Sequence, residues 1–420
     1  MSEPRSGAPR GAAGPRPWGP SPVVRGVPRE PGRRARPPAG TGRAARAAAA
    51  EDRETPRALT EVKQLLTERA RAGLSPFQGL AAEQVERVVG GLGSLDADEW
   101  AAAFSAPAER EAAVAQQAAA MDDVHGARRA HLQAYGWYRA ARFPAPTSPG
   151  KQQAYQRGQE QFLAAARYFD PPLERIKMAF PARSGEGAVV PGCLRRPAGT
   201  DPLPVAVIWG GADSGKEDVA ADPYLARDMA TLAVDMPGVG EAPLVGSADA
   251  ERLWDAVLGW IERQPDLDSE RVGFVGEGFG GYWAVKLAHT HAHRVRAVVS
   301  HAGPVHYAFS ADWIDRAEHG EYPFGLAESV GRAFGYDDPE DWRAAAPRFS
   351  LLQQGLLEQP CAPLLCVDGG EDTVVPIADQ LLLLEHGWPK SARLFPGGHL
   401  GRGPGVTSTI ADWLAWQLEA

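Results

Sequence analysis

Short apolar segments alternate with helix-like segments throughout the second half of this chain, from about residue 170 onward. Apolar runs such as "LPVAVIWGG", "RVGFVG" and "APLLCVDGG" are separated by stretches with helical periodicity, such as "ADAERLWDAVLGWIERQ". This order of strand, helix and strand predicts a mostly parallel β-sheet with helices on both faces. Because ligands of such sheets bind beyond the carboxyl ends of the strands, functional residues are expected in the loops that follow these runs.

The preceding segment has a different pattern. Apolar residues recur at intervals of three and four in "ALTEVKQLLTERARAGL" and "AAAMDDVHGARRAHLQAYGWYRAARF", with Pro or Gly at the breaks. Before it, the first fifty residues hold ten arginines and two glutamates among many Pro, Gly and Ala residues, which predicts disorder. We therefore predict a disordered basic arm at 1–54, a helical cap domain at 55–169 and an α/β core at 170–420.

Composition narrows the classes of partner. A formal net charge of −9 argues against nucleic acid as a partner of the whole chain. No apolar run reaches the roughly 18 residues of a transmembrane helix. The three cysteines form no CxxC pair, which favours a reducing compartment. We expect a cytoplasmic protein that acts on a small molecule, does not bind a membrane and has a homodimer as one possible assembly.

Histidines are clustered in "AHTHAHRV", at His289, His291 and His293. This stretch falls near the end of a predicted helix, where a solvated C-terminal turn is favoured over a metal site. No other spacing typical of metal ligands occurs. We therefore expect neither a metal nor a cofactor.

One candidate site is a phosphate-binding loop. The stretch "GGADSGKE" at 210–217 follows a predicted strand and nearly matches the pattern GxxxxGK[ST]. In a P-loop the residue after the lysine is a Ser or Thr whose hydroxyl holds Mg²⁺, whereas this chain has the carboxylate of Glu217 there. Nucleotide hydrolysis is therefore a minor alternative.

The favoured candidate combines three loops. The stretch "VGFVGEGFGGYWAVKLA" at 272–288 has the strand, glycine-rich turn and helix of a nucleophile elbow GxSxG, with Gly278 at the nucleophile position. Asp372 follows a later predicted strand in "GGEDTVVP", and His399 follows another in "PGGHLG". The order elbow, acid, histidine is that of α/β-hydrolases.

Backbone groups near the turn are the expected oxyanion hole. In this fold one N–H comes from the residue after the nucleophile and the other from a loop after an earlier strand. In this chain they belong to Phe279 and, within "IWGGADS", to Ala212. Glycine is suited to position 278, because the elbow backbone is strained and often has positive φ.

Over roughly 127–420 the chain resembles the α/β-hydrolase family that includes 2,6-dihydroxypseudooxynicotine hydrolase and the fermentation-respiration switch proteins. The resemblance rests on stretches such as "YGWYRAARF", "VIWGGADSGKED", "RVGFVGEGFGGYWA" and "LFPGGHLG". It implies an α/β-hydrolase fold with an N-terminal helical cap and a substrate between cap and core. It also implies small carbonyl substrates, including C–C bond hydrolysis, and it aligns the serine of the family with Gly278.

Five residues are candidates for substrate contacts. Glu277 precedes the nucleophile position, where a structural role is favoured. Glu241, in "PGVGEA", aligns with a glutamate of the family and either orients substrate or braces its loop, and Asp213 more often bonds its own turn. Tyr135 and Tyr138 pack within the helical domain, with the alternative that a ring faces the pocket.

Three functions are compatible with these features. In the leading one, His399 is held by Asp372 as a base near neutral pH and acts on a water at Gly278, or directly on an acidic C–H or O–H of the substrate. The outcome is ester or C–C hydrolysis, elimination or cyclisation, which would suit a step in secondary metabolism. The second function is an inactive hydrolase-fold binding or regulatory protein, and the third is the nucleotide hydrolase.

Overall fold

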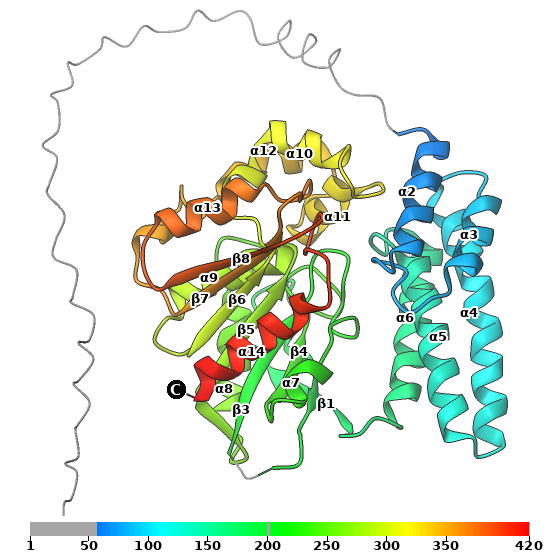
Figure 1. The fold of residues 1–420 in the computed structure, drawn as a ribbon, viewed down its shortest axis with the longest axis horizontal. Helices are drawn as coiled ribbons and strands as arrows, with labels where there is room; N and C mark the ends of the chain where they lie inside the picture. The colour runs from blue at the N-terminus through cyan, green and yellow to red at the C-terminus, as the bar shows by residue number, and fades with distance from the viewer. Residues whose placement is uncertain (1–56, 200–201, 420) are drawn as a thin grey trace, which may run out of the picture. The chain divides into compact units, whose positions relative to one another are not determined.

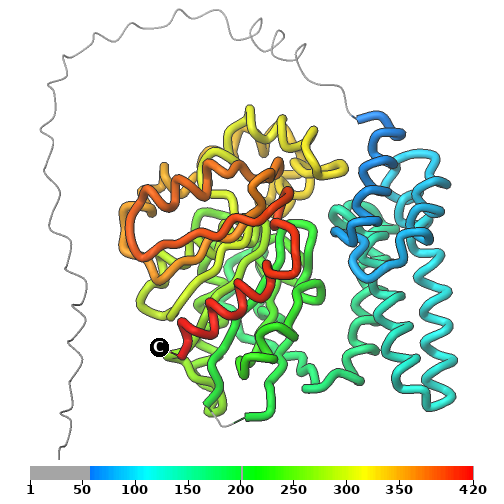
Figure 2. Tube along the Cα trace, in the orientation of Figure 1, coloured from blue at the N-terminus to red at the C-terminus, as the bar shows by residue number. Residues whose placement is uncertain are grey.

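The computed structural model describes residues 57–199 and 202–419. The predicted basic arm at 1–54 lies outside these residues. From Arg57 onward the chain forms one compact unit, and its secondary structure changes from helix to strand after residue 166 (Figure 2). The predicted boundary between the helical domain and the core stays a prediction. No helix in the described part of the chain is long and apolar enough to cross a membrane.

Five helices make up the first part of this unit, and α4, α5 and α6 pack side by side (Figure 1). Side-chain oxygens cap the N-termini of three of these helices. Asp96 accepts hydrogen bonds from the N–H groups of Asp98 and Glu99, and Asp123 and Ser148 cap the next two helices. Their buried faces gather aromatic rings such as Trp100. The helices are α2 (Leu59–Arg71), α3 (Ala82–Gly91), α4 (Ala97–Ala120), α5 (Val124–Arg142) and α6 (Pro149–Ala166).

The second part is built on an eight-stranded sheet with the order β1-β2-β4-β3-β5-β6-β7-β8. The pairs β1·β2 and β2·β4 are antiparallel and the others are parallel, so the predicted mostly parallel sheet is confirmed. The strands are β1 (Leu173–Ala179), β2 (Val189–Arg195), β3 (Leu203–Trp209), β4 (Ala230–Val234), β5 (Leu267–Glu277), β6 (Ala297–His301), β7 (Leu364–Gly369) and β8 (Lys390–Phe395).

Helices cover both faces of this sheet. Alternate residues of β3 show the division, because Val205 and Val207 pack in the core with α8 and α9, whereas Ala206 and Ile208 pack with α14. The helices that follow or flank the strands are α7 (Asp222–Leu225), α8 (Arg252–Ile261), α9 (Phe279–Thr290), α13 (Ile377–Glu385) and α14 (Gly405–Glu419).

A long helical excursion separates β6 from β7, and no element within it was predicted from the sequence. The buried carboxylate of Asp379 anchors its beginning by accepting hydrogen bonds from four consecutive N–H groups, at 305–308. The excursion contains α10 (Ala311–Glu318), α11 (Leu326–Ala333), α12 (Pro339–Ala345) and the 3₁₀ turns η1 (Tyr307–Phe309), η2 (Ala346–Phe349) and η3 (Leu356–Glu358).

A buried ion pair joins the helices to the loop after β3. Asp218 pairs with Arg142 of α5 and accepts a hydrogen bond of 2.5 Å from the hydroxyl of Tyr135. Arg142 also donates to the carbonyl of Asp213 at 3.0 Å. Because Arg142 and Tyr135 are buried, these bonds replace the water that both groups would otherwise need.

Replacing Asp218 with Ala should lower the free energy of unfolding by about 3–5 kcal/mol, because it leaves the Arg142 guanidinium buried without its counter-charge. The measurement is chemical denaturation followed by circular dichroism. The matched control is Glu109→Ala, which removes the exposed ion pair with Arg157 and should cost about 0–1 kcal/mol. Equal losses for the two variants would contradict the role given to Asp218.

Candidate active site

The sharp turn between β5 and α9 lies at the carboxyl edge of the sheet. Gly278 forms the turn with φ 53° and ψ −128°, a conformation that favours glycine. A side chain at Gly276 or Gly280 would overlap neighbouring backbone, that of Gly280 and Gly210 respectively. The glycines therefore allow three chain segments to approach one another closely at this turn.

The imidazole of His399 faces Gly278 from the loop after β8. Its Nδ1 lies 2.7 Å from Oδ2 of Asp372, in the loop after β7. A Cβ atom added to Gly278 would lie 3.3 Å from His399 Nε2. The other carboxylate oxygen of Asp372 accepts from the N–H groups of Val374 and Val375 at 2.6 and 2.9 Å. The acid is thus fixed by its own loop, and Nε2 of the histidine points to the place of the missing side chain.

A second carboxyl group, Asp368, adjoins this pair and was not recognised in the sequence. Its side chain is fully buried at the end of β7 and bonds the Gly369 N–H at 2.7 Å and Gln380 Nε2 at 3.2 Å. Burial, and then the charge of Asp372, raise the pKa of Asp368 to about 8. Asp368 therefore holds a proton at neutral pH, which it shares with Asp372. The only signal in the sequence was an aspartate at the end of a buried strand.

The charge state of His399 differs from the expectation. Burial opposes the imidazolium, but attraction to Asp372 and the hydrogen bond with it, together with the charges of Asp368 and Glu321, raise the pKa of His399 to about 9. The pKa of Asp372 is lowered, because the charge of His399 and their hydrogen bond outweigh the effect of burial. A pKa of about 9 favours the imidazolium at pH 7, whereas the sequence analysis expected a base that titrates near neutral pH. The catalytic role of His399 stays a prediction.

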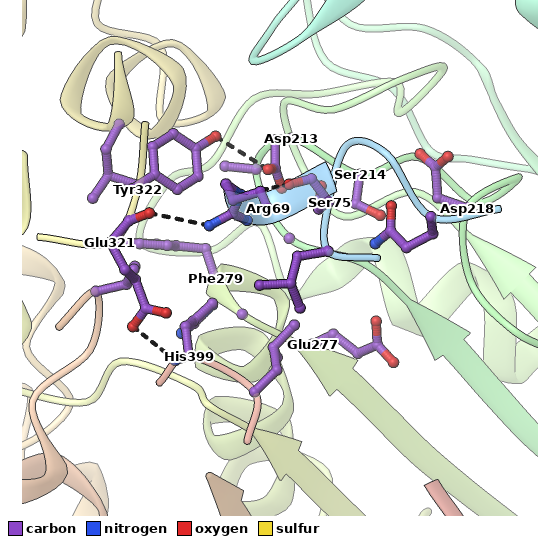
Figure 3. A pocket seen from close by; sticks show the side chains of 18 of the residues that line it. Arg69, Ser75, Asp213, Ser214, Asp218, Glu277, Phe279, Glu321, Tyr322 and His399 are labelled. Carbon is purple, nitrogen blue, oxygen red and sulfur yellow. Dashed lines mark hydrogen bonds between the residues drawn. The ribbon is translucent and has the colours of Figure 1, made fainter. Parts of the chain in front are cut away.

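Glu321, from the excursion between β6 and β7, braces the histidine loop. Its Oε1 accepts from the N–H of His399 at 2.8 Å (Figure 3). It also accepts from the N–H of Thr373 at 3.2 Å. The same carboxylate thus links the loop that carries His399 to the loop that carries Asp372. This contact could not be inferred from the sequence, since Glu321 lies in a segment for which no element was predicted.

The two N–H groups expected to form an oxyanion hole belong to adjoining segments. Those of Phe279 and Ala212 donate no hydrogen bond to another residue in the described part of the chain. The two loops are in contact, because a Cβ atom on Gly211 would lie 3.4 Å from the nitrogen of Phe279. Free donors at the start of a helix and in a neighbouring loop can stabilise a developing oxyanion.

A cavity of about 200 Å³ lies above the turn, and residues of both the helices and the sheet line it (Figure 3). Of the predicted residues, Ala212, Asp213, Glu277, Gly278, Phe279 and His399 line it. Three other candidates do not. Tyr135 bonds Asp218, Tyr138 is buried among the helices, and Glu241 bonds Lys216, so the structure gives none of them a contact with this cavity. Two cations that the sequence analysis missed, Arg69 and Arg139, also line it.

Comparison with known proteins assigns the fold and the family. A family model described as "Esterase FrsA-like" matches residues 76–391. The chain belongs to the FrsA-like esterase family. This family membership supports an enzyme of the α/β-hydrolase type with hydrolase activity in general. Esterase FrsA of Escherichia coli (strain K12) is 29% identical over 329 residues, which cover 76% of each of the two chains.

Further similarities agree with this FrsA-like assignment. Alpha/beta hydrolase ucsC of Acremonium sp is 31% identical over 243 residues, 51% of this chain and 49% of that protein, so the match spans about half of ucsC. Solved structures of 2,6-dihydroxy-pseudo-oxynicotine hydrolase and AbyA5 align with TM-scores of 0.65 and 0.67 at 24% and 23% identity. The first alignment covers 76% of this chain and 88% of the other, and the second covers 86% and 93%. The predicted α/β-hydrolase fold is thereby confirmed.

In this FrsA-like chain, the lysine of the P-loop-like stretch forms ion pairs within the protein. Lys216 is 1% exposed, and its Nζ lies 2.9, 3.0 and 2.6 Å from carboxylate oxygens of Glu217, Asp235 and Glu241. Because three carboxylates enclose the ammonium group, it cannot contact a phosphate. The nucleotide-hydrolase alternative is therefore not supported.

Two other sequence features also prove to be buried. Ser300, at the end of β6, is fully buried and its hydroxyl donates to the Gly281 carbonyl at 3.2 Å. His289 and His291 are buried too, and bond the Gln359 carbonyl and Asp255, so the prediction of a solvated histidine turn is wrong for them. Their burial follows from the packing of the end of α9 against neighbouring segments.

The raised pKa of His399 can be tested by NMR of imidazole-labelled protein. We expect a midpoint near 9 in the wild type. Asp372→Asn should lower it by about 1–3 pH units, because the neighbouring negative charge is removed. The stabilisation from this proton should be complete below the unfolded value of about 6.5. It should be lost as pH rises through about 9.

His289 serves as the internal control for that titration. Burial lowers its pKa to about 4, and it does not contact Asp372. Its midpoint should therefore be the same in both proteins. An unchanged His399 midpoint in Asp372→Asn would show that the aspartate is not the source of the raised pKa.

Proposed function

We propose that this protein is an α/β-hydrolase-fold enzyme that acts on a small carbonyl compound through general-base catalysis by His399, without an acyl-enzyme at position 278. One observation carries the proposal. The Nε2 atom of His399 is aimed at the place where a side chain of Gly278 would begin, at 3.3 Å, while Nδ1 is held by Asp372. Glycine has no atom that could attack a carbonyl, so the histidine must act on a molecule that enters this space.

Hydrolysis in this site has a simple balance of atoms. His399 takes a proton from a water above Gly278, and the resulting hydroxide adds to the substrate carbonyl carbon. The electron pair of the carbonyl moves to its oxygen, which the N–H groups of Phe279 and Ala212 stabilise. When the tetrahedral intermediate collapses, the C–O or C–C bond breaks and the proton on His399 passes to the leaving group. Water is the only co-reactant.

The same arrangement supports a variant without water. If a substrate places an acidic C–H or O–H in the space between Gly278 and Nε2 of His399, the histidine removes that proton and the same two N–H groups stabilise the enolate. Elimination or cyclisation then follows from the substrate's own structure. Activity in secondary metabolism, a cytoplasmic location and a homodimer stay predictions, as does the alternative of an inactive binding protein.

The pH dependence follows from the protonated state of His399. Because a base must first lose its proton, kcat/KM should rise with pH and level off above about 9. The measurement is initial rate against pH for a substrate that does not itself titrate over the range studied. A rate that falls as pH rises through 9 would instead require the imidazolium, and would contradict base catalysis.

Variants at two positions test the mechanism on a panel of esters, β-diketones and β-hydroxy carbonyl compounds. His399→Ala should lower kcat/KM by about 10²–10⁴-fold, the usual contribution of a general base. Gly278→Ser places an oxygen beside Nε2 and should yield an acyl adduct with an activated ester, visible by intact mass. Gly278→Ala is the matched control, because it fills the same space without a nucleophile and should give no adduct.

The outcomes separate the hypotheses. Turnover that is unchanged in His399→Ala would exclude the histidine as the base. Binding of panel compounds by the wild type without turnover across the pH range would favour the inactive binding protein. An acyl adduct on the wild type would place a nucleophile elsewhere in the cavity.

A further inference from the structure

Arg69 brings a guanidinium group from the last turn of α2 to the wall of the cavity. Two backbone carbonyls hold it: Nε donates to Ser75 at 2.7 Å and Nη1 donates to Glu321 at 3.1 Å (Figure 3). The side chain of Glu321 in turn accepts from the N–H of His399 at 2.8 Å. Arg69 and the backbone of His399 are therefore bonded to the same residue, and both residues line the same cavity.

The charge of Arg69 has no ion-pair partner among the residues that the structure describes. The other arginine of the cavity lining, Arg139, lies 3.8 Å from Asp218, and Arg71 on the same helix pairs with Glu86 at 2.7 Å. Burial is the largest influence on the pKa of Arg69 and lowers it, and the nearby Tyr322, Asp213 and Glu321 only partly offset it. A cation in such surroundings gains free energy when an anion joins it.

In the cavity wall, Asp213, Asp218 and Glu321 are hydrogen-bonded to other groups, and Glu277 lies close to a histidine. Asp213 accepts from the hydroxyl of Tyr322 at 3.1 Å, and Glu321 bonds the Thr373 and His399 loops. Glu277 lies near His301, with 3.9 Å between Oε1 and Nδ1. Among the described residues, none of these carboxylates forms an ion pair with the Arg69 guanidinium, and Nη2 of Arg69 has no hydrogen-bond acceptor.

We propose that Arg69 binds a carboxylate of the substrate, so that the enzyme selects small carbonyl acids over neutral carbonyl compounds. The inference rests on the proposed function, because it places the reacting carbonyl at Gly278 and the carboxylate toward α2. A guanidinium fork suits a carboxylate, since its donors match the two oxygens in one plane. The cavity of about 200 Å³ is suited to a compact molecule of this kind.

A purely structural role for Arg69 is the competing interpretation. A cation in the last turn of a helix interacts favourably with the helix dipole, and the two backbone carbonyls already use two of its donors. A structural arginine would contribute to stability, and its loss would weaken binding of charged and neutral ligands alike. The two roles therefore differ in the ratio of affinities for an acid and its ester.

The experiment measures calorimetric dissociation constants for 2-oxobutanoate, 4-oxopentanoate and 5-oxohexanoate, each beside its methyl ester, with the wild type and Arg69→Gln. The three acids vary the spacing between carbonyl and carboxylate. At the best spacing the wild type should prefer the acid, and Arg69→Gln should weaken acid binding by about 10–100-fold while changing ester binding less than about twofold, as expected for a charge-assisted hydrogen bond.

Two further variants serve as controls. Arg71→Gln changes the same residue type on the same helix, outside the cavity, and should leave both affinities unchanged. Arg69→Lys keeps the charge but loses the planar fork, so its preference for the acid should lie between those of wild type and Arg69→Gln. Melting temperatures identify any variant that fails to fold, in which case the comparison of Arg69→Lys with wild type decides.

Three results would overturn the inference: equal affinity of the wild type for acid and ester, equal losses for both in a folded Arg69→Gln, or no binding of any acid. If neutral esters are nevertheless turned over in a manner that depends on His399, the proposed function stands and only the choice of an anionic substrate fails. If His399→Ala leaves turnover unchanged while Arg69 still selects acids, the failure lies in the proposed mechanism instead.

Discussion

The close approach of backbone segments at the turn after β5 is the constraint on which the site depends. Side chains at Gly276 or Gly280 would overlap the backbone that passes beside them, and Gly278 needs a positive φ. These three positions let the loop after β3 lie against the start of α9, and Ala212 and Phe279 line the same cavity there. The turn keeps this geometry with glycine at its tip.

Much of the fold follows from local sequence, because buried parallel strands must be apolar along their whole length and are easily separated from amphipathic helices. The strands from β3 to β8 were predicted on this basis. The strands β1 and β2 were not predicted, and "LERIKMA" of the edge strand β1 mixes charged and apolar residues and is partly exposed. The excursion between β6 and β7 has short helices whose pattern is too brief for a periodicity argument.

The candidate site was only partly predictable, because partners distant in the sequence set the properties of its residues. Motif order placed Asp372 and His399 in neighbouring loops, but the raised pKa of His399 depends on Asp368 and Glu321 as well as on Asp372. Lys216 is a second residue whose role depends on partners distant in the sequence. Its sequence context nearly matches a phosphate-binding loop, whereas the carboxylates of Glu217, Asp235 and Glu241 surround its ammonium group.

The shared proton of Asp368 has an electrostatic consequence for the whole cavity. At neutral pH the imidazolium of His399 and the carboxylate of Asp372 cancel, while Asp368 is neutral, so this group carries no net charge. The potential at the turn is then set by the arginines and carboxylates that line the cavity. When His399 gives up its proton, the net charge of the His399–Asp372 pair becomes −1, which favours the release of an anionic product.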